Sequence, residues 1–261
     1  MKIIVLVCLL SFVAGELEFV HPNAHLIEEA HAALLSGKSS RIINGDDVQI
    51  DNYPWQASLQ FGSSHICGAA VVSSKVAITA AHCLNPNAQP NAYNIRVGST
   101  LYSGSQGTVI PVDNFIIHEA YDGNTGGFPN DIAILLFSED ITGTNKATAV
   151  PIPTDDSTFA GSKCQITGWG ITESGGISDV LQKADTTVLT RSVCRSKWGN
   201  SILSSHVCVF NEDNGACNGD SGGPLTCSGT LVGVTSWGIN GCDTGYYPSV
   251  YTRISSYREL D

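Results

Sequence analysis

Three residues in separate stretches of the chain could together hydrolyse an amide bond. His82 lies in "ITAAHCL", Asp131 in "NDIAILL" and Ser221 in "CNGDSGGPL". A serine hydroxyl attacks a carbonyl carbon when an imidazole takes its proton and a carboxylate fixes the tautomer of that imidazole. Gly219 allows the chain to turn the N–H groups of Gly219 and Ser221 toward one point, as an oxyanion hole requires. The sequence therefore offers one candidate for each part of nucleophilic acyl transfer.

Each of these residues, taken singly, also has a plain structural explanation. A histidine beside a cysteine is more often structural, and Asp131 could cap the chain reversal before its strand. A serine in a glycine-rich loop is usually a turn residue. We interpret His65 and His118 as surface or strand-edge histidines. Three further histidines lie in a segment that looks detachable: His21, His25 and His31.

The elements that would position these residues are short β-strands. From residue 42 onward, apolar runs alternate with clusters of Gly, Asn, Ser and Pro, as in "WQASLQF", "AVVSSKVAIT", "DIAILLF", "SKCQITGWG" and "GTLVGVTSWG". This spacing is typical of an all-β sandwich or barrel. Only Ser192–Trp198 and the final "ISSYREL" look like amphipathic helix.

The first 41 residues differ from the rest. Residues 1–15, "MKIIVLVCLLSFVAG", have the pattern of a secretory signal peptide, and the run is too short to span a bilayer. A buried N-terminal helix is the alternative. Residues 16–41 contain no cysteine and end in a polar hinge, which indicates an activation pro-segment. No later run approaches about 20 apolar residues, so we expect a secreted, extracellular protein without a membrane anchor.

The cysteine count agrees with secretion. Cys8 falls in the signal peptide, and an even number in a secreted chain suggests four disulfides. The sequence alone leaves about 105 pairings of eight cysteines open. No two form a CxxC pair, so zinc spacing is absent and we expect no metal and no cofactor. The eight are Cys67, Cys83, Cys164, Cys194, Cys208, Cys217, Cys227 and Cys242.

Composition excludes some classes of partner. The 261 residues carry a net charge of -11, so nucleic acid is not an expected partner, because phosphate binding needs a basic face. With 42% hydrophobic residues, the chain can bury the core of one large domain or two small ones.

Together the motifs resemble the chymotrypsin and trypsin family of serine proteases. "TAAHC", "NDIAILL" and "GDSGGPL" occur in that order, and "SLQFGSSHICG", "GWG", "SWG" and "PSVYTRI" also fit, over residues 42–261. The resemblance, closest to secreted chymotrypsin-like digestive enzymes, implies two perpendicular six-stranded antiparallel β-barrels with a short C-terminal helix. The barrels would span 42–145 and 146–261. His82 and Asp131 would come from the first barrel and Ser221 from the second.

The resemblance also assigns supporting residues. Ser236 would donate a hydrogen bond to the buried Asp131. One disulfide would brace His82 and another the wall of the specificity pocket. The implied pairs are Cys67–Cys83, Cys164–Cys227, Cys194–Cys208 and Cys217–Cys242.

Activation has candidate residues too. "SSRIINGDD" places a cleavable Arg41–Ile42 bond at the end of the pro-segment, and a trypsin-like protease should cut after arginine. In the family, the freed amino group, here that of Ile42, pairs with the aspartate before the nucleophile, here Asp220. Asn44 stands where the family usually has glycine, a change that asparagine's tolerance of unusual backbone angles accommodates.

Specificity depends on the pocket for the residue before the scissile bond. Trypsin-like members carry an aspartate six residues before the nucleophile, where this chain has Gly215, followed by Ala216. A buried Lys or Arg would lack its counter-charge there. The resemblance implies that Gly238 would leave one pocket wall open and that Ser249, where chymotrypsin and trypsin carry glycine, would narrow the opposite wall.

We therefore expect a chymotrypsin-like preference for Phe, Tyr, Leu or Met. An extension toward smaller residues is one alternative, and basic specificity created by Asp243 is the other.

The expected activity is that of a secreted, digestive endopeptidase. Its partners would be protein and peptide substrates, the activating protease and protein protease inhibitors, and it would act as a monomer. The alternatives are a narrow-specificity regulatory or defence protease and an inactive, protease-like binding module. Calcium is not expected, since "STLYSGSQGTVIPV" contains no carboxylate. The final "ISSYRELD" allows only about two helical turns, fewer than the family usually has.

Overall fold

The computed structural model describes residues 45–143, 145–171, 176–213, 215–239 and 245–257. The chain divides into the units Met1–Ser39 and Ser40–Asp261, and everything described below belongs to the second. Several predicted features lie outside the described residues: the signal peptide, the pro-segment, the Arg41–Ile42 bond, Asn44, Cys242 and Asp243.

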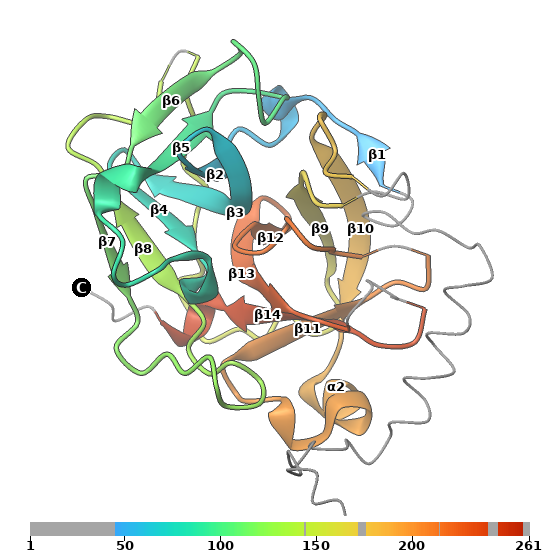
Figure 1. Ribbon diagram of the computed structural model, residues 1–261. Coiled ribbons are helices and arrows are strands. Elements are labelled where there is room, and N and C mark those ends of the chain that lie inside the picture. The colour runs from blue at the N-terminus through green and yellow to red at the C-terminus, as the bar shows by residue number, and fades with distance from the viewer. Residues whose placement is uncertain (1–44, 144, 172–175, 214, 240–244, 258–261) are drawn as a thin grey trace, which may run out of the picture. The chain divides into compact units, whose positions relative to one another are not determined.

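The first sheet has seven antiparallel strands in the order β6-β5-β2-β3-β4-β8-β7 (Figure 1). Inward residues alternate along β5, where Tyr93, Ile95 and Val97 are buried. They join Leu59 and Leu135 in one apolar cluster, which is the expected use of a period-two pattern. The strands are β2 (Gln56–Phe61), β3 (Ser64–Ser73), β4 (Val76–Thr79), β5 (Tyr93–Val97), β6 (Thr108–Pro111), β7 (Asn114–Ile117) and β8 (Ala133–Leu136).

The second sheet closes on itself. Its order is β1-β10-β11-β14-β13-β12-β9, and β9 also pairs with β10, so six strands form a barrel with β1 at its edge. Closure removes the exposed edges that an open sheet would present. The strands are β1 (Asp46–Asp47), β9 (Lys163–Gly168), β10 (Gln182–Val188), β11 (His206–Phe210), β12 (Pro224–Cys227), β13 (Thr230–Trp237) and β14 (Ser249–Arg253).

The predicted all-β architecture with two barrel-like sheets is confirmed, with one difference in detail. The second sheet is the expected six-stranded barrel. The first is a half-barrel, because its edge strands β6 and β7, four residues each, share no ladder within the described residues.

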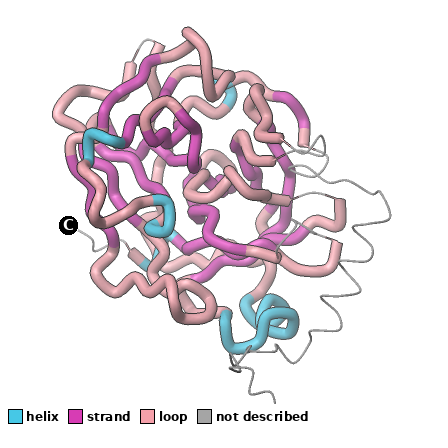
Figure 2. The backbone as a smooth tube through the Cα atoms, viewed as in Figure 1, coloured by secondary structure: helices cyan, strands magenta, loops and turns pink. Residues whose placement is uncertain are grey.

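Helix is scarce, as Figure 2 shows. The segment predicted at 192–198 is the helix α2 (Arg191–Trp198). Thr190 caps its start by accepting the N–H of Val193 at 3.3 Å, and Gly199 ends it at φ +63°. The short 3-10 turns are η1 (Ile50–Asn52), η2 (Ala81–Cys83), η3 (Pro90–Ala92), η4 (Gly199–Ser201) and η5 (Ile254–Ser256).

The expected C-terminal helix is represented in the described residues only by the turn η5. None of the described helices is long and apolar enough to cross a membrane.

Three of the four expected disulfides are confirmed: Cys67–Cys83, Cys164–Cys227 and Cys194–Cys208. Cys217 is also disulfide-bonded, but its expected partner Cys242 lies outside the described residues.

Candidate active site

His82 and Asp131 are brought together by strand pairing. His82 lies in η2, directly after β4, and Asp131 lies just before β8, which pairs with β4 through Thr79 and Ala133. The Asp131 Oδ2 atom is 2.8 Å from His82 Nδ1, and Oδ1 accepts the backbone N–H of His82 at 2.9 Å. A carboxylate can only accept, so Nδ1 carries the proton and Nε2 remains free to act as a base.

The second barrel holds Asp131 from the other side. Ser236, in β13, donates its hydroxyl to Oδ2 at 2.5 Å, and Thr252, in β14, donates to the backbone oxygen of Asp131 at 2.7 Å. Asp131 is fully buried, whereas the His82 side chain is 30% exposed. The three hydrogen bonds to the carboxylate compensate the cost of burying its charge.

Ser221 sits on a turn that is packed against the first sheet. Gly222 has φ +76°, and a Cβ there would lie 2.2 Å from Thr79 Oγ1, so only glycine fits. The N–H of Gly68, in β3, donates to the backbone oxygen of Ser221 at 2.7 Å. This hydrogen bond fixes the position of the turn relative to β3, beside η2.

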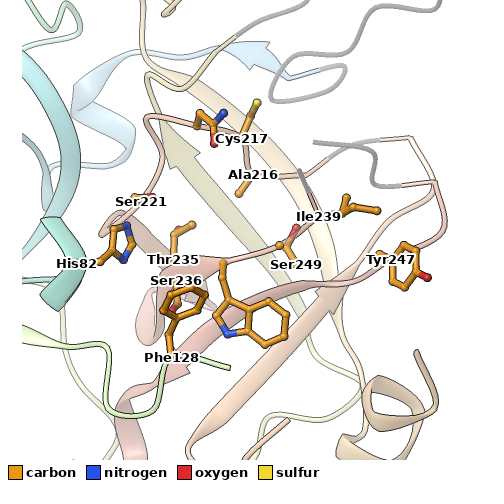
Figure 3. Close-up of a pocket in the computed structure, with 13 residues that line it drawn as sticks. His82, Phe128, Ala216, Cys217, Ser221, Thr235, Ser236, Ile239, Tyr247 and Ser249 are labelled. Atoms are coloured by element: carbon orange, nitrogen blue, oxygen red, sulfur yellow. The ribbon is translucent and has the colours of Figure 1, made fainter. Parts of the chain in front are cut away.

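Ser221 and His82 line the same cavity, which has a volume of about 330 Å³ (Figure 3). The hydrogen bonds among the described residues do not include one between the Ser221 hydroxyl and His82 Nε2. Such contacts are often loose before substrate binds and tighten in the complex. The backbone N–H groups of Gly219 and Ser221 donate to no acceptor within the described residues, so both are available to a ligand.

Asp220, the residue before Ser221, is completely buried. Its carboxylate accepts the N–H of Gly170 at 2.8 Å and the N–H of Cys217 at 2.9 Å. Burial raises the pKa of Asp220 to about 7, because the loss of solvation disfavours the charged carboxylate more than the two backbone hydrogen bonds favour it. A Cβ at Gly168 or Gly170 would lie 2.1 or 2.3 Å from the carboxylate oxygens, which explains the glycines of "GWG".

The interpretation of His65 as a surface or strand-edge histidine is wrong. The side chain is buried, with Nδ1 2.8 Å from Ser58 Oγ and Nε2 3.0 Å from the carbonyl oxygen of Gly219. Burial lowers the pKa of His65, so the ring is neutral, donates to Gly219 and accepts from Ser58. The histidine thereby fixes the carbonyl of Gly219. Period-two alternation along β3 was the available signal, since it turns this residue inward.

For His118, the interpretation as a surface or strand-edge histidine agrees better with the structure. It is half-buried just after β7, and its Nδ1 accepts the N–H of Ala120 at 3.1 Å.

Three of the four predicted pocket residues line the cavity: Ala216, Gly238 and Ser249. A Cβ at Gly238 would lie 4.0 Å from the Cα of Ser249, so these two residues face each other. The fourth, Gly215, is buried but is not part of the lining. Sequence reasoning missed the lining residues Phe128, Trp237, Ile239 and Tyr247.

His82, Cys67 and Cys83 have donor atoms within 4.8 Å of one another, as in a metal site. Both cysteines are consumed in a disulfide and offer no thiolate, so the group does not fit a metal ion.

Comparison with known proteins identifies the family. The trypsin family model matches residues 42–260. The chain belongs to the trypsin family of serine proteases. By family it is therefore a serine endopeptidase, and the two described sheets have the fold of that family.

Individual relatives of the trypsin family agree. The chain is 38% identical to "Chymotrypsin-like serine proteinase" of Haliotis rufescens, over 87% of this chain and 92% of that protein. It is 40% identical to "Trypsin epsilon" of Drosophila erecta, over 87% and 88%. The structure of neuropsin, a serine protease expressed in the limbic system of mouse brain, superposes with a TM-score of 0.74 at 30% identity, over 82% of this chain and 96% of that one.

Proposed function

We propose that the activated protein hydrolyses peptide bonds through a covalent acyl-enzyme on Ser221. The observation that carries the proposal is the hydrogen-bonded chain from Ser236 through Asp131 to His82, which opens into the cavity that Ser221 lines. His82 Nε2 takes the proton of the Ser221 hydroxyl as Oγ attacks the carbonyl carbon. The N–H groups of Gly219 and Ser221 stabilise the oxyanion.

The tetrahedral intermediate then collapses. The C–N bond breaks, His82 gives its proton to the leaving amine, and the acyl group remains on Ser221. Water, deprotonated by His82, hydrolyses the ester and restores the serine. The Asp131 carboxylate stays ionised throughout and stabilises the imidazolium.

The proposed precursor is a secreted zymogen. Cleavage of the Arg41–Ile42 bond by a trypsin-like protease would release an ammonium group to pair with Asp220. The raised pKa of the Asp220 carboxyl supports this role, because a buried acid without a cation gains most from a new positive partner. That ion pair would order the backbone that carries the oxyanion donors.

The proposed specificity is for large apolar or aromatic residues before the scissile bond. No acidic side chain lines the cavity among the described residues, so a lysine or arginine would be buried without a counter-charge. The walls include Ala216, Trp237 and Ile239, which suit an apolar side chain. One relative is named chymotrypsin-like and others are named trypsins, so family membership alone does not decide this point. We further propose a digestive role on dietary protein, as a monomer subject to protein inhibitors.

A panel of succinyl-peptide anilides tests the specificity. The chain is activated by trypsin, the trypsin is removed, and kcat/KM is measured for peptides ending in Phe, Leu, Ala and Arg. We expect Phe and Leu to be the best substrates. Arg as the best substrate would contradict the pocket assignment, and no hydrolysis of any peptide would contradict the proposed activity.

A further inference from the structure

Asp131 stands at the apex of a tight turn whose shape is set by the residue before it. The N–H of Ile132 donates to the backbone oxygen of Asn130 at 2.8 Å, so the three residues form a γ-turn. Asn130 has φ +59°, in the left-handed region that favours glycine and that asparagine tolerates better than most residues. The direction in which the Asp131 side chain leaves the turn therefore depends on the backbone of Asn130.

The side chain of Asn130 is held at both ends. Its Nδ2 donates to the backbone oxygen of Ala120 at 2.8 Å, and its Oδ1 is 3.0 Å from the hydroxyl of Tyr257. A backbone oxygen can only accept, so the amide nitrogen must face Ala120 and the amide oxygen must face Tyr257. The tyrosine hydroxyl is therefore the donor. Two hydrogen bonds thus hold a residue whose backbone conformation is uncommon.

Tyr257 comes from the far end of the chain and is itself fixed in place. It directly follows η5, and its N–H donates to the backbone oxygen of Ile254 at 2.9 Å. Its ring meets that of His118 edge to face, with centroids 5.3 Å apart, and packs against the apolar cluster of the first sheet. In Figure 1 the red end of the described chain lies where β7 ends and β8 begins. The packing of the ring therefore holds the hydroxyl against Asn130.

The hydroxyl of Tyr257 keeps its proton at any pH at which a histidine acts as a base. Burial raises the pKa of Tyr257, a hydrogen bond with the Ser205 side chain opposes the rise, and the charge of Asp131 adds to it. The hydroxyl can therefore donate to Asn130 throughout the working range of the proposed enzyme.

We propose that Asn130 and Tyr257 are positioning residues for catalysis. The hydrogen bond between them keeps Asp131 oriented so that its carboxylate can hold His82. Without this bond, Asn130 can rotate toward negative φ, and the carboxylate leaves the position in which Oδ1 and Oδ2 reach His82 at 2.9 and 2.8 Å. The inference rests on the proposed endopeptidase activity. Among the described residues, the cavity lining includes neither Asn130 nor Tyr257, so the effect should fall on kcat and not on substrate binding.

The test compares the activated wild type with Tyr257→Phe, Asn130→Gly and the double variant on a succinyl-peptide anilide ending in Phe. Glycine keeps the left-handed backbone accessible, and this variant is needed because Tyr257→Phe also removes the interaction with Ser205. With enzyme concentrations from active-site titration, each single variant should lower kcat about three- to tenfold with little change in KM. The double variant should lose about as much as the more impaired single variant, because all three lack the same bond.

The pH profile separates positioning from general stability. With Asp131 displaced, the imidazolium of His82 is less stabilised, so the acid limb of kcat/KM should move toward lower pH in Tyr257→Phe. Tyr53→Phe is the matched control, since the Tyr53 hydroxyl also donates to an amide oxygen, that of Gln165, at 3.1 Å. This control should lower the free energy of unfolding to a similar extent and leave kcat and the pH profile unchanged.

Two results would overturn the inference. One is a kcat and a pH profile of Tyr257→Phe that match those of Tyr53→Phe. The other is a loss of kcat in the double variant that equals the product of the two single losses. A wild type that hydrolyses no anilide after cleavage at Arg41 would instead contradict the proposed activity on which the inference depends.

Discussion

At the scale of single residues, the site depends on a few hydrogen bonds, and the effect of removing each one can be measured separately. Ser236 and Thr252 both donate to Asp131, but Ser236 contacts the carboxylate and Thr252 contacts only the backbone oxygen. The first bond affects the orientation and charge of the group that holds His82. The second joins the two sheets without touching that group.

We predict that Ser236→Ala lowers kcat about 10- to 100-fold with little change in KM, because a hydrogen bond to a charged group is worth about 1.5–3 kcal/mol. Thr252→Ala is the control. It should lower the free energy of unfolding by about 1 kcal/mol and change kcat less than about threefold. Steady-state kinetics and denaturant unfolding of both variants measure the difference. Equal losses of kcat would show that Ser236 has only a structural role.

Ser249 is the residue that should set the size of the pocket, since it faces Gly238 across the cavity. Ser249→Gly removes its side chain from the wall and should raise the ratio of kcat/KM for Phe over Ala by about 3- to 10-fold, as one or two heavy atoms in a pocket are worth about 1 kcal/mol or more. The Ala substrate serves as the internal control. An unchanged ratio would mean that Ser249 does not limit the pocket.

At the scale of elements, alternation and turn residues predict the strands and α2, and tertiary contacts decide the rest. The period-two pattern of "YNIRV" becomes β5 with its apolar residues inward. The same pattern could not reveal that His65 reaches Gly219, because that contact joins β3 to a loop 154 residues away. Phe128 was missed for the same reason, since it enters the cavity from a loop at φ +48°.

The strand β11 carries a second buried histidine, His206. Its Nδ1 accepts the N–H of Leu203 at 3.2 Å, and its ring centroid is 6.0 Å from that of Trp237, in the cavity wall. Burial lowers the pKa of His206 to about 4, with Asp131 opposing the shift and Arg191 adding to it. The fold therefore holds this imidazole neutral at a pH where the unfolded chain is protonated.

We predict that His206 makes the protein less stable in acid. Between pH 6.5 and 4 the unfolded state binds a proton that the folded state does not, so stability falls as pH falls, by about 3 kcal/mol over this window. His206→Met, of similar size and not titratable, should lack this component. Denaturant unfolding gives the free energy of unfolding of both proteins at several pH values, and the difference between the two proteins is the contribution of His206. The titrations of Asp220 and His65 cancel in this difference, because both proteins contain these residues. Parallel stability curves would contradict the prediction.

At the scale of the whole molecule, the site exists only where the two sheets meet. His82 and Asp131 come from the first sheet, while Ser221 and Ser236 come from the second. Sequence motifs located these residues because the chemistry of each one requires particular residue types next to it in the chain. The open first sheet could not be predicted, since it depends on which edge strands happen to pair.

The proposed activation would depend on this whole arrangement, because the new terminus would have to reach Asp220, which is buried next to Ser221. We predict that the Asp220→Asn variant is cut at Arg41 at the wild-type rate. After the cut, its activity should be at least about 100-fold below that of the wild type, because losing a buried ion pair costs about 3–5 kcal/mol. Electrophoresis follows the cut, and an anilide substrate follows the activity. Full activation of the variant would show that activation does not depend on the carboxylate of Asp220.

The central claim is that Ser221 is the nucleophile, activated by His82. The most direct measurement is labelling with diisopropyl fluorophosphate after cleavage at Arg41, followed by mass spectrometry of the peptides. We predict one adduct per chain, on the Ser221 peptide, with labelling strongly slowed in His82→Ala. Absence of an adduct, or an adduct on another residue, would contradict the account.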